Sequence, residues 1–184
     1  DGPGNIKYIS GGSGVEELIR LEDRYLKRFI DNISLLDRIA DFIIIDTGAG
    51  LSDNTSNFIM ASDEIILVTT PEPTAITDAY AVIKYISNRD KNKKIRLLVN
   101  KVENMYEAES VFCKFLAVSE KFLSIKPEYF GYVCNDENVR KSVKAQQPFI
   151  ISYPRSNASK NIREISVKLI REMNRNINGE NYGK

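Results

Sequence analysis

The sequence predicts an α/β fold in which a doubly wound, mostly parallel sheet is flanked by helices on both faces. Short runs of β-branched residues without polar alternation recur along the chain, as expected of strands covered on both faces. Segments with apolar residues at helical spacing separate these runs, and this order favours right-handed crossovers between parallel strands. The length of 184 residues and the 42% hydrophobic content fit one globular domain.

Five runs are predicted strands. Three of them are unalternating and rich in isoleucine, leucine and valine, which is typical of parallel strands buried on both faces. In chain order, the predicted strands span residues 7–9, 42–45, 65–68, 95–99 and 129–133.

Helices are predicted between consecutive strands and towards the end of the chain, where apolar residues recur every three or four positions. Ile76, Ile83 and Ile86 line one side of such a helix, and Thr74 is its expected cap. The predicted helices span residues 15–36, 76–86, 106–123, 137–145 and 157–176, with one more between the second and third strands, and residues 178–184 are expected to form a flexible tail.

Composition and charge argue against several classes of function. The net charge of +1 gives no electrostatic reason to expect nucleic-acid binding, and no apolar run approaches the roughly 20 residues that span a bilayer. The sequence shows no signal peptide, and Cys113 and Cys134 are expected to be reduced thiols, so we expect a cytoplasmic protein. Histidine is absent, so any chemistry would use carboxylates, backbone amides, lysines or a bound metal.

In open parallel sheets, ligands bind beyond the carboxyl ends of the strands, which directs attention to the loops after them. Residues 11–14, Gly-Gly-Ser-Gly, follow a predicted strand but lack the Gly-Lys-Ser/Thr ending with which a Walker A loop holds phosphate and magnesium. Glu17 also stands where a dinucleotide-binding fingerprint would need glycine. We interpret this loop as a structural turn that starts a helix.

The loop after the second predicted strand, Asp46-Thr47-Gly48-Ala49-Gly50, carries a stronger signal. An aspartate at the tip of a buried strand is the Walker B arrangement, in which the carboxylate holds magnesium, often through water. Gly48 and Gly50 would let backbone amides approach a phosphate and let the loop move when that phosphate leaves. The alternative is an aspartate that ends a strand and caps the next helix.

Two further loops have an open interpretation. Asn100 ends the strand at 95–99, and its amide could pair with a base edge because it offers both a donor and an acceptor. It could equally close a strand turn. Residues 69–74, Thr-Thr-Pro-Glu-Pro-Thr, are either a plain helix start or a contact surface near the site.

Several segments of the sequence identify a family more specifically than the spacing of single residues does. They are DTGAGLSDN, TTPEPTAITDAY, LLVNKV, GYVCNDENVRKSV and QQPFIISYPRSNAS. Together they resemble the MinD/ParA family of deviant Walker A ATPases, and within it the flagellar-number regulators called FlhG or YlxH. The resemblance runs from about residue 7 to residue 173, and it implies a P-loop NTPase fold.

The resemblance implies roles for six residues. Asp46 would organise Mg²⁺ and act in catalysis, and Gly48 and Gly50 would flank the γ-phosphate, although most of the wider family has proline in place of Gly48. Asn100 would contact the adenine, with Asp136 and Pro148 bordering the base. Family members bind ATP, close into a dimer across the nucleotides and hydrolyse slowly, with flagellar proteins such as an assembly GTPase as partners.

The resemblance also implies what this sequence lacks. The glycine-rich phosphate loop and the switch I aspartate of the family would lie upstream of Asp1, so residues 1–177 would be the C-terminal part of a single ATPase domain without its first βα unit. The 184-residue chain by itself is then expected to be inactive. Two rival functions are a chromosome or plasmid partition ATPase and a non-catalytic interaction module.

Family members often anchor to a membrane through a C-terminal helix, and peripheral association at the inner face of the cell membrane is one implication for this chain. Ile162, Ile165 and Leu169 belong to an apolar stripe with basic neighbours near the end of the sequence. A helix packed on the core explains this stripe better, because residues 178–184 offer almost nothing to bury in lipid.

Overall fold

A computed structural model describes residues 2–9, 36 and 39–177 of the chain. The chain divides into two compact units, Asp1–Ala61 and Ser62–Lys184, and each is described by itself. The predictions for residues 11–14, for the tail and for all but the last residue of the helix at 15–36 lie outside the described residues.

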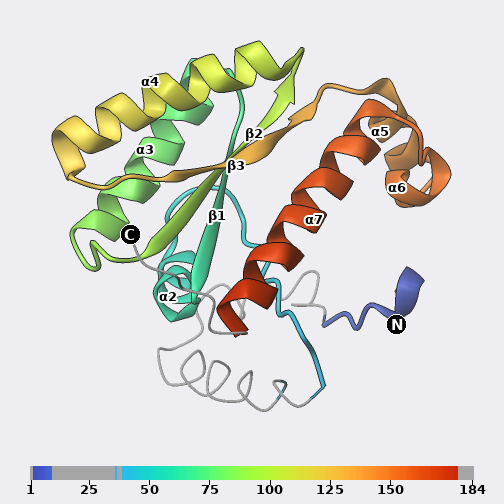
Figure 1. Ribbon diagram of the computed structural model, residues 1–184, viewed down its shortest axis with the longest axis horizontal. Coiled ribbons are helices and arrows are strands. Elements are labelled where there is room, and N and C mark those ends of the chain that lie inside the picture. The colour runs from blue at the N-terminus through green and yellow to red at the C-terminus, as the bar shows by residue number, and fades with distance from the viewer. Residues whose placement is uncertain (1, 10–35, 37–38, 178–184) are drawn as a thin grey trace. The chain divides into compact units, whose positions relative to one another are not determined.

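The unit Ser62–Lys184 is built on a parallel sheet flanked by helices, which confirms the predicted fold class. Its elements are β1 (Glu64–Thr69), α3 (Pro73–Ser87), β2 (Lys94–Val102), α4 (Met105–Leu123), β3 (Glu128–Cys134), α5 (Glu137–Lys144), α6 (Phe149–Ser152) and α7 (Asn157–Ile177). The strands lie in the order β1-β2-β3 and all pairs are parallel. Figure 1 shows α3 and α4 on one side of this sheet and α7 on the other.

The main core lies between the sheet and the pair α3 and α4. Along β2, every second side chain points to this face, and Ile95, Leu97 and Val99 are almost fully buried there. Ile83 and Ile86 of α3 are completely buried. Apolar residues at period two on the strand and at helical spacing on α3 therefore bury one continuous layer, as the sequence pattern predicts.

The opposite face of β2 carries a buried cation, Arg96, whose side chain is only 1% exposed. Its guanidinium pairs with Glu64 of β1 and, at 2.7 Å, with Glu172 of α7. It also lies 4.9 Å from the centre of the Phe130 ring. A buried guanidinium is tolerated only when carboxylates compensate its charge, so this cluster joins β1, β2 and α7.

Helix α7 packs on β3. Ile165, from its apolar stripe, lies so near Gly131 that a Cβ built on that glycine would be 3.0 Å from Ile165 Cγ1. The ammonium group of Lys168 donates a hydrogen bond to the carbonyl of Tyr129 at 2.7 Å. Ile165 therefore faces the sheet, as a core-packing helix requires, whereas Ile170, further along the same stripe, is 48% exposed.

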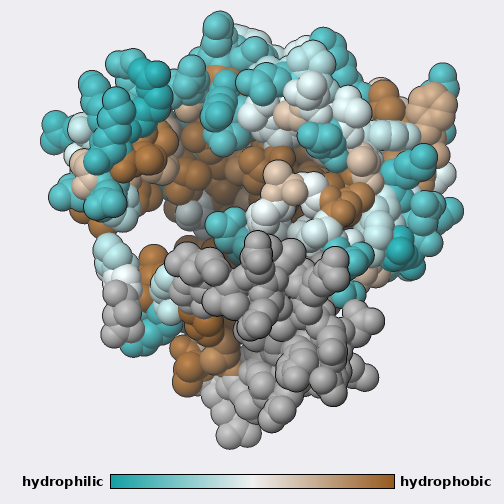
Figure 2. Space-filling model, turned by 180° about the vertical axis from the view of Figure 1, so that it is seen from behind, coloured by the Kyte–Doolittle hydropathy of each residue, from teal (hydrophilic) through white to brown (hydrophobic). Residues whose placement is uncertain are grey.

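Within this unit, the face of the sheet on which α7 packs is only partly covered. Ile66 and Val68 of β1 alternate with the buried Ile65 and Leu67, and they remain exposed. Hydrophobic residues are brown in Figure 2, and some of them reach the surface on the face that it shows. None of the described helices is long and apolar enough to cross a membrane.

In the unit Asp1–Ala61, the described elements are the short 3-10 helix η1 (Pro3–Asn5) and α2 (Asp53–Ala61). The predicted buried strand at 42–45 is wrong, since these residues pair with no described strand and all stay exposed, Ile44 to 83%. The strand predicted at 7–9 is not formed either. An apolar run becomes a buried strand only when neighbouring strands satisfy its backbone groups, and no described strand does so here.

Two local predictions in the larger unit need correction. Thr74 does not cap α3, because the helix begins at Pro73 with Glu72 as the capping residue. Proline fits the first helical position, where its missing N–H is not needed, and it sets the start of α3 one residue before Thr74. The four-residue helix α6 is absent from the sequence prediction, since it is too short to show a periodic pattern.

Candidate functional site

The carboxyl ends of the three strands lie along one edge of the sheet, because all strands are parallel. Asn100, near the end of β2, pairs in register with Val133 of β3. The backbone N–H of Asn135 donates to the carbonyl of Val102 at 2.8 Å, which ties the loop after β3 to the end of β2. Two of the predicted base-side residues, Asn100 and Asp136, are thus brought to the same edge.

The end of β2 contains an irregularity at Lys101. The register shifts between Asn100 and Val102, so Lys101 is an extra residue relative to β3. Its φ angle is 57°, in the left-handed region that a residue with a side chain rarely adopts. The backbone N–H of Lys101 donates to Asn100 Oδ1 at 2.8 Å. Such backbone conformations cost free energy and cluster at functional sites.

Asp136 joins two helix starts. Its Oδ1 accepts from the N–H of Asn138 at 2.9 Å and caps α5, while its Oδ2 accepts from the N–H of Ala158 at 3.2 Å in the first turn of α7. Partial burial by itself would raise the pKa of this carboxyl, but hydrogen bonds from Asn138, Ala158 and Ser156 outweigh it and lower the pKa. Both oxygens are therefore occupied by the fold, and Asp136 shapes this edge rather than presenting a free carboxylate.

The segment around Pro148 is held close to the start of α7. Pro148 precedes α6 as its capping residue. Ser159, a fully buried residue of α7, donates to the carbonyl of Tyr153 at 2.8 Å. Since Asp136 binds the residue before Ser159, the loop after β3, the α6 segment and the start of α7 form one connected rim. The signal for this rim in the sequence is the Asp136-Glu137-Asn138 start of a helix.

The Asp46 loop belongs to the other unit. Gly50 has a φ angle of 83°, which favours glycine, and a Cβ at Gly48 or Gly50 would meet no atom within 4 Å. The cap of α2 is Ser52, whose Oγ accepts from the N–H of Thr55 at 3.1 Å. Asp46 therefore does not serve as the helix cap that the alternative interpretation requires, and its carboxylate binds no described residue.

The Asp46 loop fits a magnesium ion that takes most of its ligands from water and from a substrate phosphate. The described residues contain no group of three or more carboxylate or cysteine side chains that could enclose a metal. Mg²⁺, however, commonly binds one or two protein carboxylates together with water and substrate phosphates. A single free carboxylate beside two open glycines suits a metal that arrives with a phosphate ligand.

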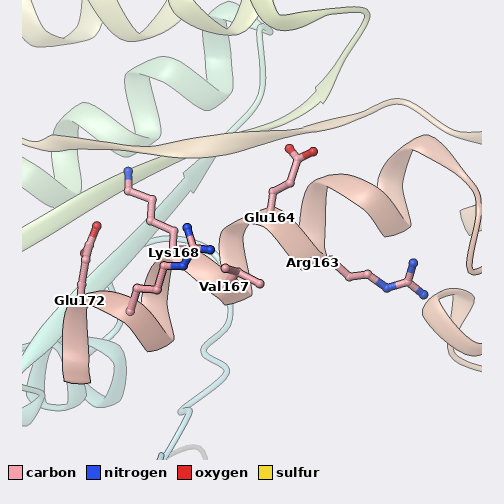
Figure 3. A pocket seen from close by; sticks show the side chains of 6 residues that line it. Arg163, Glu164, Val167, Lys168 and Glu172 are labelled. Atoms are coloured by element: carbon pink, nitrogen blue, oxygen red, sulfur yellow. The ribbon is translucent and has the colours of Figure 1, made fainter. Parts of the chain in front are cut away.

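A separate pocket lies along α7, on residues that the sequence analysis did not single out as a site. Figure 3 shows its lining, in which Lys168 extends toward the sheet and Arg163 points away from it. Charges of both signs line this wall. The lining residues are Arg163, Glu164, Val167, Lys168, Arg171 and Glu172.

Sequence reasoning missed Lys101. A left-handed residue is normally signalled by glycine or asparagine, and lysine gives no such signal. The position could have been suspected only from the Asn-Lys pair at the end of a buried strand.

No family model matches the sequence. The chain is 32% identical over 168 residues to the antiactivator FleN of Pseudomonas aeruginosa, a match that covers 91% of this chain and 60% of that protein. It is 30% identical over 169 residues to the flagellum site-determining protein YlxH of Helicobacter pylori, covering 91% of this chain and 53% of that protein. The chain thus spans little more than half the length of these relatives.

A similar fold is found in the cell division ATPase MinD of Pyrococcus furiosus. The TM-score is 0.65 at 20% sequence identity, and the superposition covers 87% of this chain and 63% of that one. At this identity the likeness concerns the fold.

Proposed function

The chain belongs to the MinD/ParA family, and on that premise we propose that the protein is an ATP-binding switch ATPase that controls flagellar number or placement. In this proposal ATP brings two copies together, and hydrolysis to ADP and phosphate resets the switch. The flagellar role follows the relatives, since YlxH is named a flagellum site-determining protein.

The observation that carries the nucleotide-binding part is the amide of Asn100 at the carboxyl edge of a parallel sheet. Ligands of open α/β sheets bind at this edge. The amide is half-buried, and no described residue accepts a hydrogen bond from its Nδ2. The rim held together by Asp136 and the Pro148 segment lies beside it, so adenine would contact Asn100 and be bordered by that rim.

The phosphate side would use the Asp46 loop. Asp46 would hold Mg²⁺, which supplies charge neutralisation to the phosphates, and the backbone at Gly48 and Gly50 would approach the γ-phosphate. The support is the free carboxylate, the left-handed Gly50 and the open space at both glycines. The 184 residues contain no phosphate-loop lysine, so we expect this chain by itself to release no phosphate from ATP above background.

Partners follow from the same proposal. A second copy of the protein would bind in the ATP state, and a flagellar protein such as an assembly GTPase would read that state. Peripheral attachment to the inner face of the membrane would use a segment other than α7, because α7 packs on β3 with Ile165 of its apolar stripe against Gly131.

The test uses the full-length protein and the substitution Asp46→Ala. Phosphate release with ATP and Mg²⁺ should fall by at least a hundredfold, which corresponds to a few kcal/mol of lost transition-state stabilisation. The ATP-dependent shift from monomer to dimer, followed by light scattering, should weaken. Asp41→Ala is the matched control, since that exposed carboxylate precedes the 42–45 run and should leave the rate unchanged.

Hydrolysis by Asp46→Ala within twofold of the unsubstituted protein would refute the role of Asp46. A protein that neither binds ATP nor dimerises with it would support the non-catalytic module instead. ATP-dependent binding to DNA of any sequence would favour a partition ATPase over a flagellar regulator.

The base side is tested by Asn100→Ala, which should weaken ATP binding by roughly 1–3 kcal/mol, the usual cost of unpaired base-edge groups. Binding is measured by calorimetry for ATP and GTP. If stability falls while the preference between the two nucleotides is unchanged, Asn100 is a strand-end structural residue.

A further inference from the structure

The irregular residue Lys101 is held in place by its neighbours rather than by its own side chain. Val99 and Val102, on either side of the Asn100-Lys101 pair, are completely buried. Val102 also accepts the hydrogen bond from Asn135, which anchors the strand beyond the bulge. The side chain of Lys101 is exposed and makes no ion pair with a described residue. The left-handed backbone is therefore imposed by the two buried anchors of β2.

This conformation determines how the amide of Asn100 is oriented. The Lys101 N–H can donate only to an acceptor, so the oxygen Oδ1 must face it and the amino group Nδ2 must face away. The reversed amide would set two donors against each other. Oδ1 keeps a second lone pair free, and Nδ2 has no described acceptor, so an acceptor and a donor are offered in a fixed order.

We propose that Lys101, through its left-handed backbone, is a positioning residue that fixes the Asn100 amide and thereby sets a preference for adenine over guanine nucleotides. This inference rests on the proposed function, because it assumes that Asn100 contacts the base. It concerns the backbone of Lys101, not the charge of its side chain.

Base-edge chemistry gives the reason. Adenine presents an acceptor at N7 and a donor at its N6 amino group, which match one amide that donates and accepts at once. Guanine presents acceptors at both N7 and O6. An amide free to turn could avoid the clash between O6 and its own oxygen by offering only its amino group. An amide held by the Lys101 N–H cannot, so guanine leaves an acceptor facing an acceptor.

The experiment compares four substitutions at Lys101 in the full-length protein. Glycine and asparagine adopt the left-handed region readily, so Lys101→Gly and Lys101→Asn remove the charge and keep the conformation. Valine and threonine are β-branched and disfavour it, so Lys101→Val and Lys101→Thr change the conformation. Dissociation constants for ATP and GTP are measured with Mg²⁺ by calorimetry, and circular dichroism establishes that each variant is folded.

We expect the ATP-over-GTP preference of the glycine and asparagine variants to stay within twofold of that of the unsubstituted protein. In the valine and threonine variants it should fall by roughly tenfold, the loss of one base-edge discrimination. An unchanged preference in a folded valine or threonine variant overturns the proposal. A lost preference in the glycine and asparagine variants also overturns it, because it would place the effect in the lysine side chain.

Folding does not obscure the result. If neither β-branched variant folds, the glycine and asparagine variants still test the inference, since a lost preference refutes it and a retained preference excludes the lysine side chain as its source. An unsubstituted protein without any preference for ATP contradicts the proposed base contact itself. If the unsubstituted protein prefers ATP and this preference does not change with the backbone conformation at Lys101, only this inference is contradicted.

Discussion

Replacing Asp136 by alanine should destabilise two helices at once. The carboxylate caps α5 through Asn138 and also accepts from Ala158 in the first turn of α7. Loss of one helix cap typically costs about 1 kcal/mol, so losing both acceptors should cost about 1–3 kcal/mol. In a chain of this size, that corresponds to a fall in melting temperature of about 2–12 °C.

The assay is urea unfolding of the unsubstituted protein and of Asp136→Ala, followed by circular dichroism at several pH values. Hydrogen bonds lower the pKa of Asp136 in the folded state, so its contribution is present above the unfolded pKa of about 4 and is lost as the pH falls through the lower, folded value. The difference between the two proteins should therefore be full at pH 7 and disappear in strong acid.

Glu137→Ala is the matched control for this prediction. Glu137 is the next carboxylate along the chain. It is exposed, and among the described residues it pairs with Arg140 alone, across one helical turn. Its removal should cost less than about 0.5 kcal/mol. An Asp136→Ala effect as small as that of Glu137→Ala, or one that persists unchanged below pH 2, would show that the double cap does not stabilise the fold.

Two further predictions concern the contact of α7 with the sheet. Gly131→Ala should destabilise the protein by about 1–3 kcal/mol in urea unfolding, because its φ angle of 149° disfavours a side chain and the new Cβ would lie 3.0 Å from Ile165 Cγ1. If Ile165→Ala does not reduce that cost, the steric explanation fails. Glu172→Gln should cost about 1–3 kcal/mol by leaving the buried Arg96 with less compensation, whereas Glu164→Gln on the same helix should cost almost nothing, and equal effects would refute the ion-pair argument.

The sequence predicts the larger unit well because its strands and helices pack against one another within that unit. The run at 95–99 and the helical spacing of Ile83 and Ile86 produce the elements expected of them, since strand and helix bury the same layer. The run at 42–45 has an equally strong pattern, yet it stays exposed. An apolar pattern reports what a segment needs to bury, and the presence of a neighbouring strand is a separate condition.

Part of the candidate site can likewise be predicted from the sequence, and part of it cannot. Residue type alone points to Asn100 and Asp136 at the ends of strands. It does not reveal that both Asp136 oxygens are already bonded, because Ala158, one of the donors, lies 22 positions further along the chain. It also does not reveal the left-handed Lys101, because that conformation comes from the register shift against β3 and not from lysine itself.

The buried Arg96 also has a consequence for how the strands find their alignment. β1 and β2 could slide past each other by two residues and still place isoleucine, leucine and valine on the correct face, because these side chains substitute for one another. A slide in the direction that carries Glu64 away from Arg96 would move it by about 7 Å along the strand and take one carboxylate from the guanidinium. Glu172 of α7 would remain beside Arg96, but a buried cation that loses one of its compensating carboxylates is destabilised. This misalignment is therefore disfavoured by charge, although the apolar side chains alone would tolerate it.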